Sequence, residues 1–258
     1  MASSNSIPDM SDAEWQTRVD LAACYRLLAH FGMTDLVANH ISAKIPGTEE
    51  FLLNPYGWLY EEITASSLIK LDIGGNILQN PHSDYSINRA GYVVHSAVHQ
   101  ARKDVGCVIH THTPAGVAVS TMSCGILPLT QSAMRFSEIG YHDFEGVAVN
   151  EAEKVSLVRD LGQADVMVLR NHGLLACGST VAQAFNNIYR IERVCQIQLL
   201  AMSANTELIQ PDADVIQLAN RHYASGTGAV ARKPSPLGEL AWPAMLRLLS
   251  MKSPGYDQ

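Results

Sequence analysis

The sequence predicts one layered α/β or α+β domain over residues 11–205. Helical and strand patterns alternate along this range, and several of the strands are joined by short turns. The 258 residues are 47% hydrophobic and 17% charged, and no internal repeat is visible. A chain of this length and composition can bury a large core without the help of a disulfide or a metal.

The first part of the chain should hold a flexible arm, one helix and two hairpins. The arm covers residues 1–10. Ser11 and Glu14 have the spacing of a capping box, and the apolar positions after them continue to a stop at Gly32. Alternating or apolar runs beside Gly-containing turns then predict four strands, over 41–45, 51–54, 68–73 and 77–78.

The second part should alternate longer helices with buried strands. Apolar residues recur at helical spacing over 88–102, and an apolar strand follows over 105–112. Thr113 and Pro114 are well suited to begin the next helix. After it we expect strand and turn over 137–149, a helix over 155–161, strands over 166–169 and 174–177, and a long helix from Thr180 to about Ala204.

A tail follows over residues 206–258. Pro and Gly interrupt it, and its one apolar stretch is Leu237–Met251. We interpret this stretch as a docking helix. It could cover a neighbouring subunit or its own, and the sequence leaves both possibilities open.

The charge and cysteine content exclude several classes of protein. Lys and Arg number 18 against 25 Asp and Glu, a net charge of −7, which disfavours nucleic-acid binding. No apolar run approaches the ~18 residues of a membrane span, and the first residues lack a secretory pattern. The five cysteines are scattered and form no CxxC pair, as is typical of reduced thiols. We therefore expect a cytoplasmic protein without membrane or nucleic-acid partners.

Three histidines have the pattern of a metal site. His110 and His112 flank one residue at the end of the predicted strand 105–112, so both imidazoles face the same side. His172 lies in a Gly-containing turn after the strand 166–169. Two strand ends can thus present three imidazoles with open coordination positions, the layout of a catalytic metal centre. The alternative is that each histidine bonds to a separate backbone partner.

Two other histidines favour a structural role. His95 and His99 lie four residues apart on the predicted helix 88–102, beside its apolar stripe and without the acidic residue of an HExxH motif. Packing or hydrogen bonding is the better interpretation. Cys107 should point away from His110 on their strand, which disfavours a Cys–His nucleophile. The motifs GxSxG, GxxxxGK[ST] and GxGxxG are absent.

The chain resembles the class II aldolase/adducin family, and in particular its fuculose-phosphate aldolases. The likeness extends over residues 12–205. It is carried by the Asn-His-Ile-Ser strand within 21–45, the loop 54–64, the helix and His-x-His strand within 90–112, and the Arg-Asn-His-Gly turn within 170–175. The resemblance implies a three-layer α/β/α sandwich around a largely antiparallel central sheet, and a homotetramer with active sites at subunit contacts.

The resemblance also implies roles for individual residues. It makes His110, His112 and His172 the ligands of a divalent ion, Zn first, with Mn or Fe as alternatives. It places Asn39, Tyr56, Gly57 and Arg89 where the sugar-phosphate aldolases bind substrate.

One catalytic group of those aldolases is missing. Gly91 stands where they carry their catalytic glutamate. The residue that replaces this acid is open, with His142, Tyr141 and Gln131 as candidates.

These observations predict a metal-dependent lyase. Its reaction would be aldol-type cleavage or decarboxylation of a small anionic hydroxy-keto or hydroxy-acid compound. Two alternatives remain, an adducin-like binding module without catalysis and a three-histidine iron oxygenase. Three convergent histidines would serve no purpose in an inert module, so we favour an enzyme.

Overall fold

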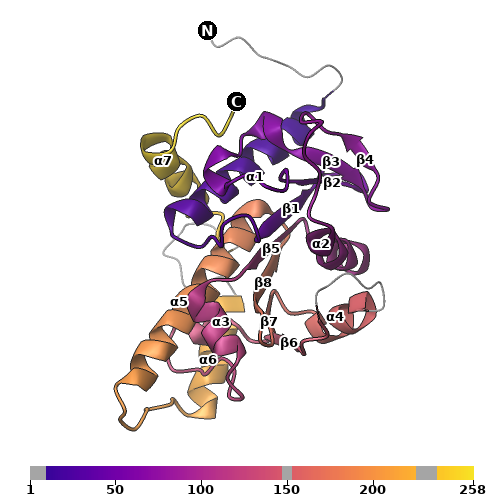
Figure 1. Ribbon diagram of the computed structural model, residues 1–258. Coiled ribbons are helices and arrows are strands. Elements are labelled where there is room, and N and C mark those ends of the chain that lie inside the picture. The colour runs from indigo at the N-terminus through magenta and orange to yellow at the C-terminus, as the bar shows by residue number, and fades with distance from the viewer. Residues whose placement is uncertain (1–9, 147–152, 225–236) are drawn as a thin grey trace.

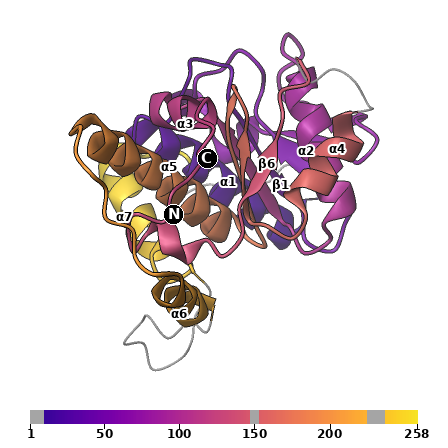
Figure 2. The same cartoon turned by 90° about the horizontal axis from the view of Figure 1, so that it is seen from below.

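The computed structural model describes residues 10–146, 153–224 and 237–258. The expected arm 1–10 therefore lies almost wholly outside the described residues. A central sheet of eight strands runs in the order β4-β3-β2-β1-β5-β8-β7-β6, and helices cover both of its faces (Figures 1 and 2). The expected three-layer α/β/α sandwich is confirmed.

Every neighbouring pair of strands is antiparallel except β6 with β7. The sheet is therefore largely antiparallel, as expected. The strands are β1 (His40–Lys44), β2 (Glu50–Leu53), β3 (Ile69–Asp72), β4 (Ile77–Gln79), β5 (Cys107–Thr111), β6 (Gly140–His142), β7 (Val166–Leu169) and β8 (Gly173–Gly178).

The helices begin and end close to the positions that the sequence predicts. Ser11 accepts a hydrogen bond from the backbone of Glu14 and caps the first helix, and Thr180 caps the long helix through Gln183 in the same way. The helices are α1 (Asp12–His30), α2 (Arg89–Ala101), α3 (Pro114–Ser120), α4 (Glu153–Leu161), α5 (Val181–Ser203), α6 (Ala213–Ala224) and α7 (Trp242–Lys252). Short 3-10 turns lie at Tyr60–Glu62, Ala65–Ser67 and Ala133–Arg135.

Alternation along the strands divides the interior into two sides. On β5, Cys107 and Ile109 join the larger core beneath α1 and α5, while Val108 joins a second core beneath α2 and α4. Cys107 thus points away from His110, as predicted. The face that receives His110 is the α2–α4 face, and the candidate site lies there.

The tail differs from its expected form by one additional helix. It contains α6, which we did not predict and which has no buried residue. It also docks on its own chain: Leu249 of α7 is fully buried, and the Trp242 indole donates to Asp20 of α1 at 3.0 Å. The predicted strand and turn over 137–149 is reduced to β6, and residues 147–149 lie outside the described residues.

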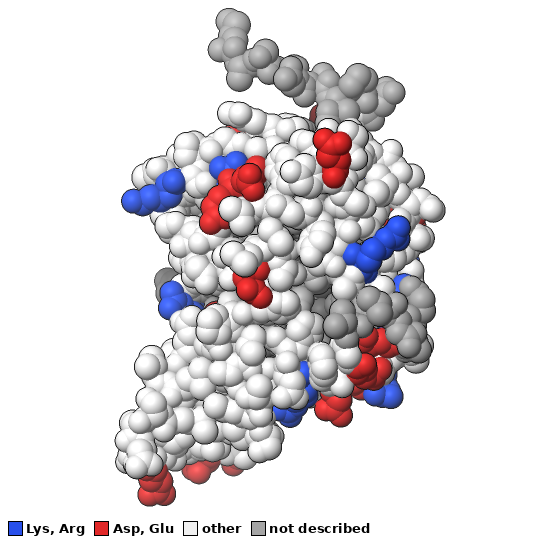
Figure 3. Space-filling view, viewed as in Figure 1, with Lys and Arg blue, Asp and Glu red and all other residues white. Residues whose placement is uncertain are grey.

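The surface agrees with the composition. On the face shown in Figure 3, basic and acidic side chains of the described residues lie singly or in small mixed groups among uncharged ones. None of the described helices combines the length and apolarity that a membrane crossing requires.

Candidate metal centre

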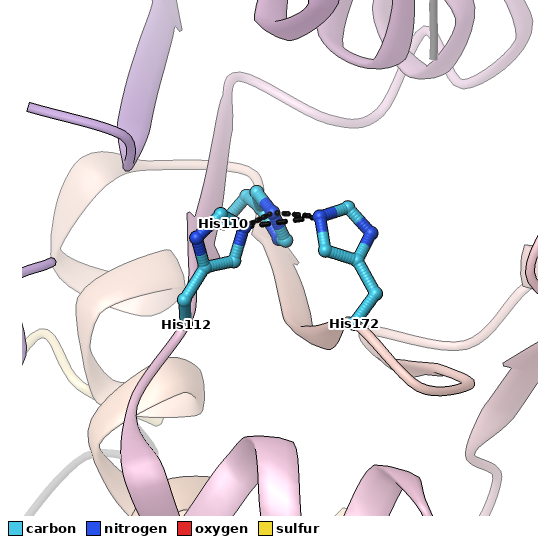
Figure 4. Close-up of side chains that lie close together, drawn as sticks. All are labelled: His110, His112 and His172. Carbon is cyan, nitrogen blue, oxygen red and sulfur yellow. Dashed lines mark hydrogen bonds between the residues drawn. The ribbon is translucent and has the colours of Figure 1, made fainter. Parts of the chain in front are cut away.

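The three predicted histidines converge at one end of the central strands (Figure 4). His110 lies on β5, His112 directly follows that strand, and His172 lies in the turn between β7 and β8. Their Nε2 atoms are 2.8 Å apart for His110 and His112, 3.0 Å for His112 and His172, and 3.2 Å for His110 and His172. The expectation that two strand ends bring these imidazoles together is met.

The turn that carries His172 depends on unusual backbone geometry. Asn171 adopts a positive φ of 56°, a conformation that asparagine tolerates better than most residues. Gly173 follows because a Cβ there would collide with the carbonyl oxygen of Thr111. The Asn-His-Gly sequence thus allows β8 to start against β5 with His172 aimed at its partners.

Neighbouring groups fix the tautomers of two of the ligands. The Nδ1 of His110 donates to the carbonyl of Leu174 at 2.9 Å, and the Nδ1 of His112 donates to Asp35 at 3.1 Å. Asn39 accepts from the backbone N–H of His112 at 3.1 Å. Because both Nδ1 atoms carry the ring proton and donate it, both Nε2 atoms hold free lone pairs. Histidines that bind metals commonly have such a hydrogen-bond acceptor behind the ring.

The donor set fits a divalent ion. Zn–N bonds of about 2.0–2.1 Å in tetrahedral geometry hold two ligand nitrogens about 3.3 Å apart, close to the separations here. Burial lowers the pKa of His110 well below its usual value and lowers the pKa of His172 to about 4. Both rings are therefore neutral near pH 7 and available as ligands. Three nitrogen ligands leave coordination positions open for a substrate.

A second group of histidines lies on the same face of the sheet. His40 Nδ1 is 2.7 Å from His95 Nε2, His95 Nδ1 is 2.6 Å from Ser42 Oγ, and that oxygen is 2.8 Å from His99 Nε2. His95, Ser42 and His99 are fully buried, and His40 is 5% exposed. His95 and His99 therefore have the hydrogen-bonding role that their sequence position favoured.

His40 explains the glycine at position 91. A Cβ on Gly91 would lie 2.6 Å from Cδ2 of the His40 ring, and the ring centroids of His40 and His110 are 5.1 Å apart. The space beside Gly91, where the family resemblance led us to expect a carboxylate, is thus filled by an imidazole from β1. Sequence reasoning missed His40, because its neighbour in space is 51 residues away and nothing local marks the pair.

The predicted substrate residues are not all in one place. Asn39 is buried, and its amide bonds to the Met33 carbonyl and the His112 backbone, which is a supporting position for the metal site. Tyr56 is 48% exposed, and Gly57 follows it with a φ of +102°. Their loop is held to the segment before α2 by the hydrogen bond from Tyr56 N to Ser86 O. Arg89 begins α2 with an exposed side chain.

The three catalytic candidates have different environments. Gln131 is exposed. The Tyr141 hydroxyl accepts from the Ile126 backbone at 3.0 Å, and the Arg170 guanidinium stacks on its ring. His142 is buried and lines a small pocket that it shares with His172.

Comparison with known proteins gives a consistent result. The family model described as the class II aldolase and adducin N-terminal domain matches residues 19–199. A protein of Pseudomonas aeruginosa, named only as an aldolase class 2 protein, is 50% identical over 96% of this chain and 95% of its own. Rat alpha-adducin is 38% identical over 90% of this chain, which spans 32% of that longer protein.

Solved structures agree with these relatives. An aldolase II superfamily protein from Pseudomonas syringae superposes with a TM-score of 0.90 at 42% identity, covering 97% of this chain and 98% of the other. The L-fuculose 1-phosphate aldolase of Glaciozyma antarctica gives a TM-score of 0.79 at 23% identity, covering 96% of each chain. The second likeness is one of fold.

Proposed function

Because the chain belongs to the class II aldolase and adducin family, we propose that it is a metal-dependent carbon–carbon lyase. Its substrate would be a small anionic hydroxy-keto or hydroxy-acid compound, cleaved by an aldol-type reaction or decarboxylated. The observation that carries the proposal is the convergence of three Nε2 atoms, two of them with their Nδ1 protons already engaged.

His110, His112 and His172 would hold one divalent ion, with Zn the first expectation and Mn or Fe the alternatives. A bound ion supplies Lewis-acid stabilisation of the negative charge that develops on a carbonyl oxygen. Leu174 and Asp35 keep two of the imidazoles in the ligating tautomer. Arg89, exposed at the first residue of α2, offers a guanidinium for a carboxylate or phosphate of the substrate, with Tyr56 and Gly57 as further substrate contacts.

Metal content tests the centre directly. Purified wild-type protein should contain one ion per chain, and His112→Ala should contain none. His30→Ala is the matched control, since His30 is an exposed histidine at the end of α1. Full occupancy in His112→Ala would refute the site.

A substrate panel tests the reaction. Phosphorylated and unphosphorylated β-hydroxy ketones and hydroxy acids should be offered to protein loaded with Zn, Mn or Fe, with and without O₂. Cleavage or CO₂ release without O₂ is the expected result. Strict consumption of O₂ by the iron form would replace the lyase with an oxygenase.

One observation favours a second function. The position of the aldolases' acid is Gly91, and its space is filled by His40, so the scaffold could serve as an adducin-like binding module. Two results together would favour the module. The fully metal-loaded protein would convert no compound of the panel, and it would bind a protein partner saturably.

We also propose a homotetramer in the cytoplasm. The support for assembly is the apolar surface around α7: Leu237 is 40% exposed, Leu240 68% and Met251 74%, although the other side of that helix covers its own chain. The five free thiols suit a reducing compartment. Light scattering should give a mass near four chains, and a mass of one chain at micromolar concentration would contradict the proposal.

A further inference from the structure

The pocket beside His172 contains a histidine whose contacts are those of a proton-transfer group. His142 ends β6, and its backbone is fixed next to the ligand turn, because its carbonyl accepts from Arg170 N at 2.8 Å. Arg170 and His172 line the pocket together with His142. The imidazole is thus fastened, through its own main chain, to the turn that presents one of the proposed metal ligands.

The His142 ring is oriented by a carboxylate. Its Nδ1 is 2.8 Å from Asp160 Oδ2 on α4, and Asp160 also accepts from Arg159 at 2.8 Å. The Arg159 hydrogen bond is the largest cause that lowers the pKa of Asp160, so this carboxylate is ionised near pH 7. An ionised Asp160 can only accept, and it therefore holds the proton of His142 on Nδ1.

The other nitrogen has no hydrogen-bond partner. His142 is only 3% exposed, and its Nε2 is buried without a hydrogen bond among the described residues. The Glu153 carboxylate lies 3.7 Å from this nitrogen, beyond hydrogen-bond reach. A buried polar atom without a partner destabilises the folded protein, so this nitrogen would gain from a hydrogen bond to a bound molecule.

The pocket shows which way this nitrogen faces. Glu153 lines the pocket and lies on the Nε2 side of the ring, whereas Asp160, on the Nδ1 side, is not part of the lining. Nε2 therefore lies on the side of the ring that borders the pocket, and His172 is another residue of the same lining. Tyr141 is a weaker candidate, because it is not part of the pocket lining and its hydroxyl oxygen accepts from the Ile126 backbone N–H.

Resting on the proposed lyase function, we propose that His142 is a catalytic residue that accepts and returns the substrate proton at Nε2, with Asp160 as its positioning residue. In aldol cleavage the O–H proton of the β-hydroxy ketone moves to Nε2 as the C–C bond breaks. The oxygen forms the new carbonyl of the leaving aldehyde, and the bonding electron pair stays with the α-carbon of the other fragment. The imidazolium then returns the proton to that carbon.

The charges around the ring suit a transient imidazolium. Asp160 and Glu153 approach it from α4, Asp143 and Glu145 line the same pocket, and Arg170 and His172 oppose them from the ligand turn. Four acidic groups thus lie near the ring or line its pocket, against Arg170, His172 and the Arg159 guanidinium that is bonded to Asp160. This arrangement gives the site a base in place of the carboxylate that Gly91 lacks.

The kinetic test uses the β-hydroxy ketone that zinc-loaded wild-type protein cleaves fastest. His142→Gln should lower kcat by 10²–10⁴-fold, the usual contribution of general acid–base catalysis, with an unchanged zinc content. Asp160→Asn should lower kcat by a smaller factor and displace the pH profile, and free imidazole should restore part of the activity of His142→Ala. His30→Gln, an exposed histidine, is the control. Activity in His142→Gln within fivefold of wild type at full zinc content would overturn the inference and leave the lyase function standing.

A second measurement needs no turnover. In metal-free protein labelled with ¹⁵N-histidine, His142 should show a protonated Nδ1 and an unprotonated Nε2 at pH 7.5, and Asp160→Asn should change this pattern. Acetohydroxamate added to the zinc-loaded protein should shift the Nε2 resonance, while the His30 signals stay fixed. A proton on Nε2, or an Nε2 signal that does not respond to acetohydroxamate, would overturn the proposal. Loaded wild-type protein that cleaves nothing would defeat the lyase function, and this inference with it.

Discussion

Two groups of histidines lie on the same face of one sheet, and they differ in where their protons can go. In the metal centre, His110, His112 and His172 turn their Nε2 atoms toward one another, and two of their Nδ1 protons are used elsewhere. In the buried group, His40, His95 and His99 are linked through each other and through Ser42, so a proton can lie in every contact. The first arrangement suits a bound cation, whereas the second is held together by hydrogen bonds among its own members.

The comparison shows that nitrogen–nitrogen distance alone does not identify a metal site. His40 and His95 approach to 2.7 Å, closer than any pair of ligand Nε2 atoms. What distinguishes the two groups is the second nitrogen of each ring and its partner. The two groups should therefore respond differently to substitution, to pH and to metal.

The largest effect should appear when one histidine of each group is replaced and the zinc affinities of the two variants are compared. His172→Ala should lower zinc affinity by at least ~100-fold, because it removes a direct ligand, whereas loss of an outer-shell partner typically costs 10–100-fold. His99→Ala should leave zinc affinity within a few-fold of wild type, because its ring bonds to the buried Ser42 and contacts none of the three converging histidines in the described contacts. Competition with a chromogenic chelator measures both variants. Equal losses of zinc affinity in the two variants would show that the two groups do not differ in metal binding.

The second prediction concerns pH. Burial lowers the pKa of His99 to about 4 in the folded protein, below the 6.5 of an exposed histidine. The unfolded chain therefore binds this proton first as the pH falls, and the free energy of unfolding should decrease between about pH 6.5 and pH 4. The share of His99 is about 3 kcal/mol, since one pKa unit is 1.36 kcal/mol.

Urea unfolding of metal-free protein at a series of pH values measures this slope. His99→Gln should show a smaller decrease across the same window, because the glutamine does not titrate. An unchanged slope in the variant would mean that His99 is not the neutral, buried ring that the structure describes. The metal must be absent, because ion binding has a pH dependence of its own.

The third prediction tests the contact between the two groups. Gly91→Ala should destabilise the protein by about 1–3 kcal/mol, the usual cost of overpacking, because its Cβ would meet the His40 ring at 2.6 Å. In a His40→Ala background the same change should cost less, which gives a coupling energy in a double-mutant cycle. Additive effects would show that His40 does not fill the space at Gly91. The collision also means that a glutamate cannot be restored at position 91 unless His40 moves.

The sequence predicted one of these groups better than the other. The His-x-His spacing and the His-Gly turn are local features at strand ends, so the centre of His110, His112 and His172 could be anticipated. The pairing of His40 with Gly91 is a contact between a strand and a helix far along the chain, and no spacing rule reports it. The same limit hid the role of Asp160 behind His142, since side-chain packing across α4 and β6 determines it.

The fold shows the same division. Capping residues and apolar positions at helical spacing predicted α1, α2 and α5 closely, whereas α6, which buries no residue, was missed in the Pro- and Gly-interrupted tail. The parallel pairing of β6 with β7 also could not be read locally. Periodicity alone does not report the pairing direction of a very short strand.

The smallest effect should come from the edge of the metal centre. Asp35 accepts from His112 Nδ1 at 3.1 Å, but its side chain is 50% exposed, so water can replace it. Asp35→Asn should therefore lower zinc affinity by no more than about tenfold, at the weak end of outer-shell effects. Asn39→Ala is the informative partner, because Asn39 is buried, holds the His112 backbone at 3.1 Å, and cannot be replaced by water as easily. Competition titrations should give the larger loss for Asn39→Ala. The reverse order would mean that the tautomer of His112, and not the position of its main chain, limits metal affinity.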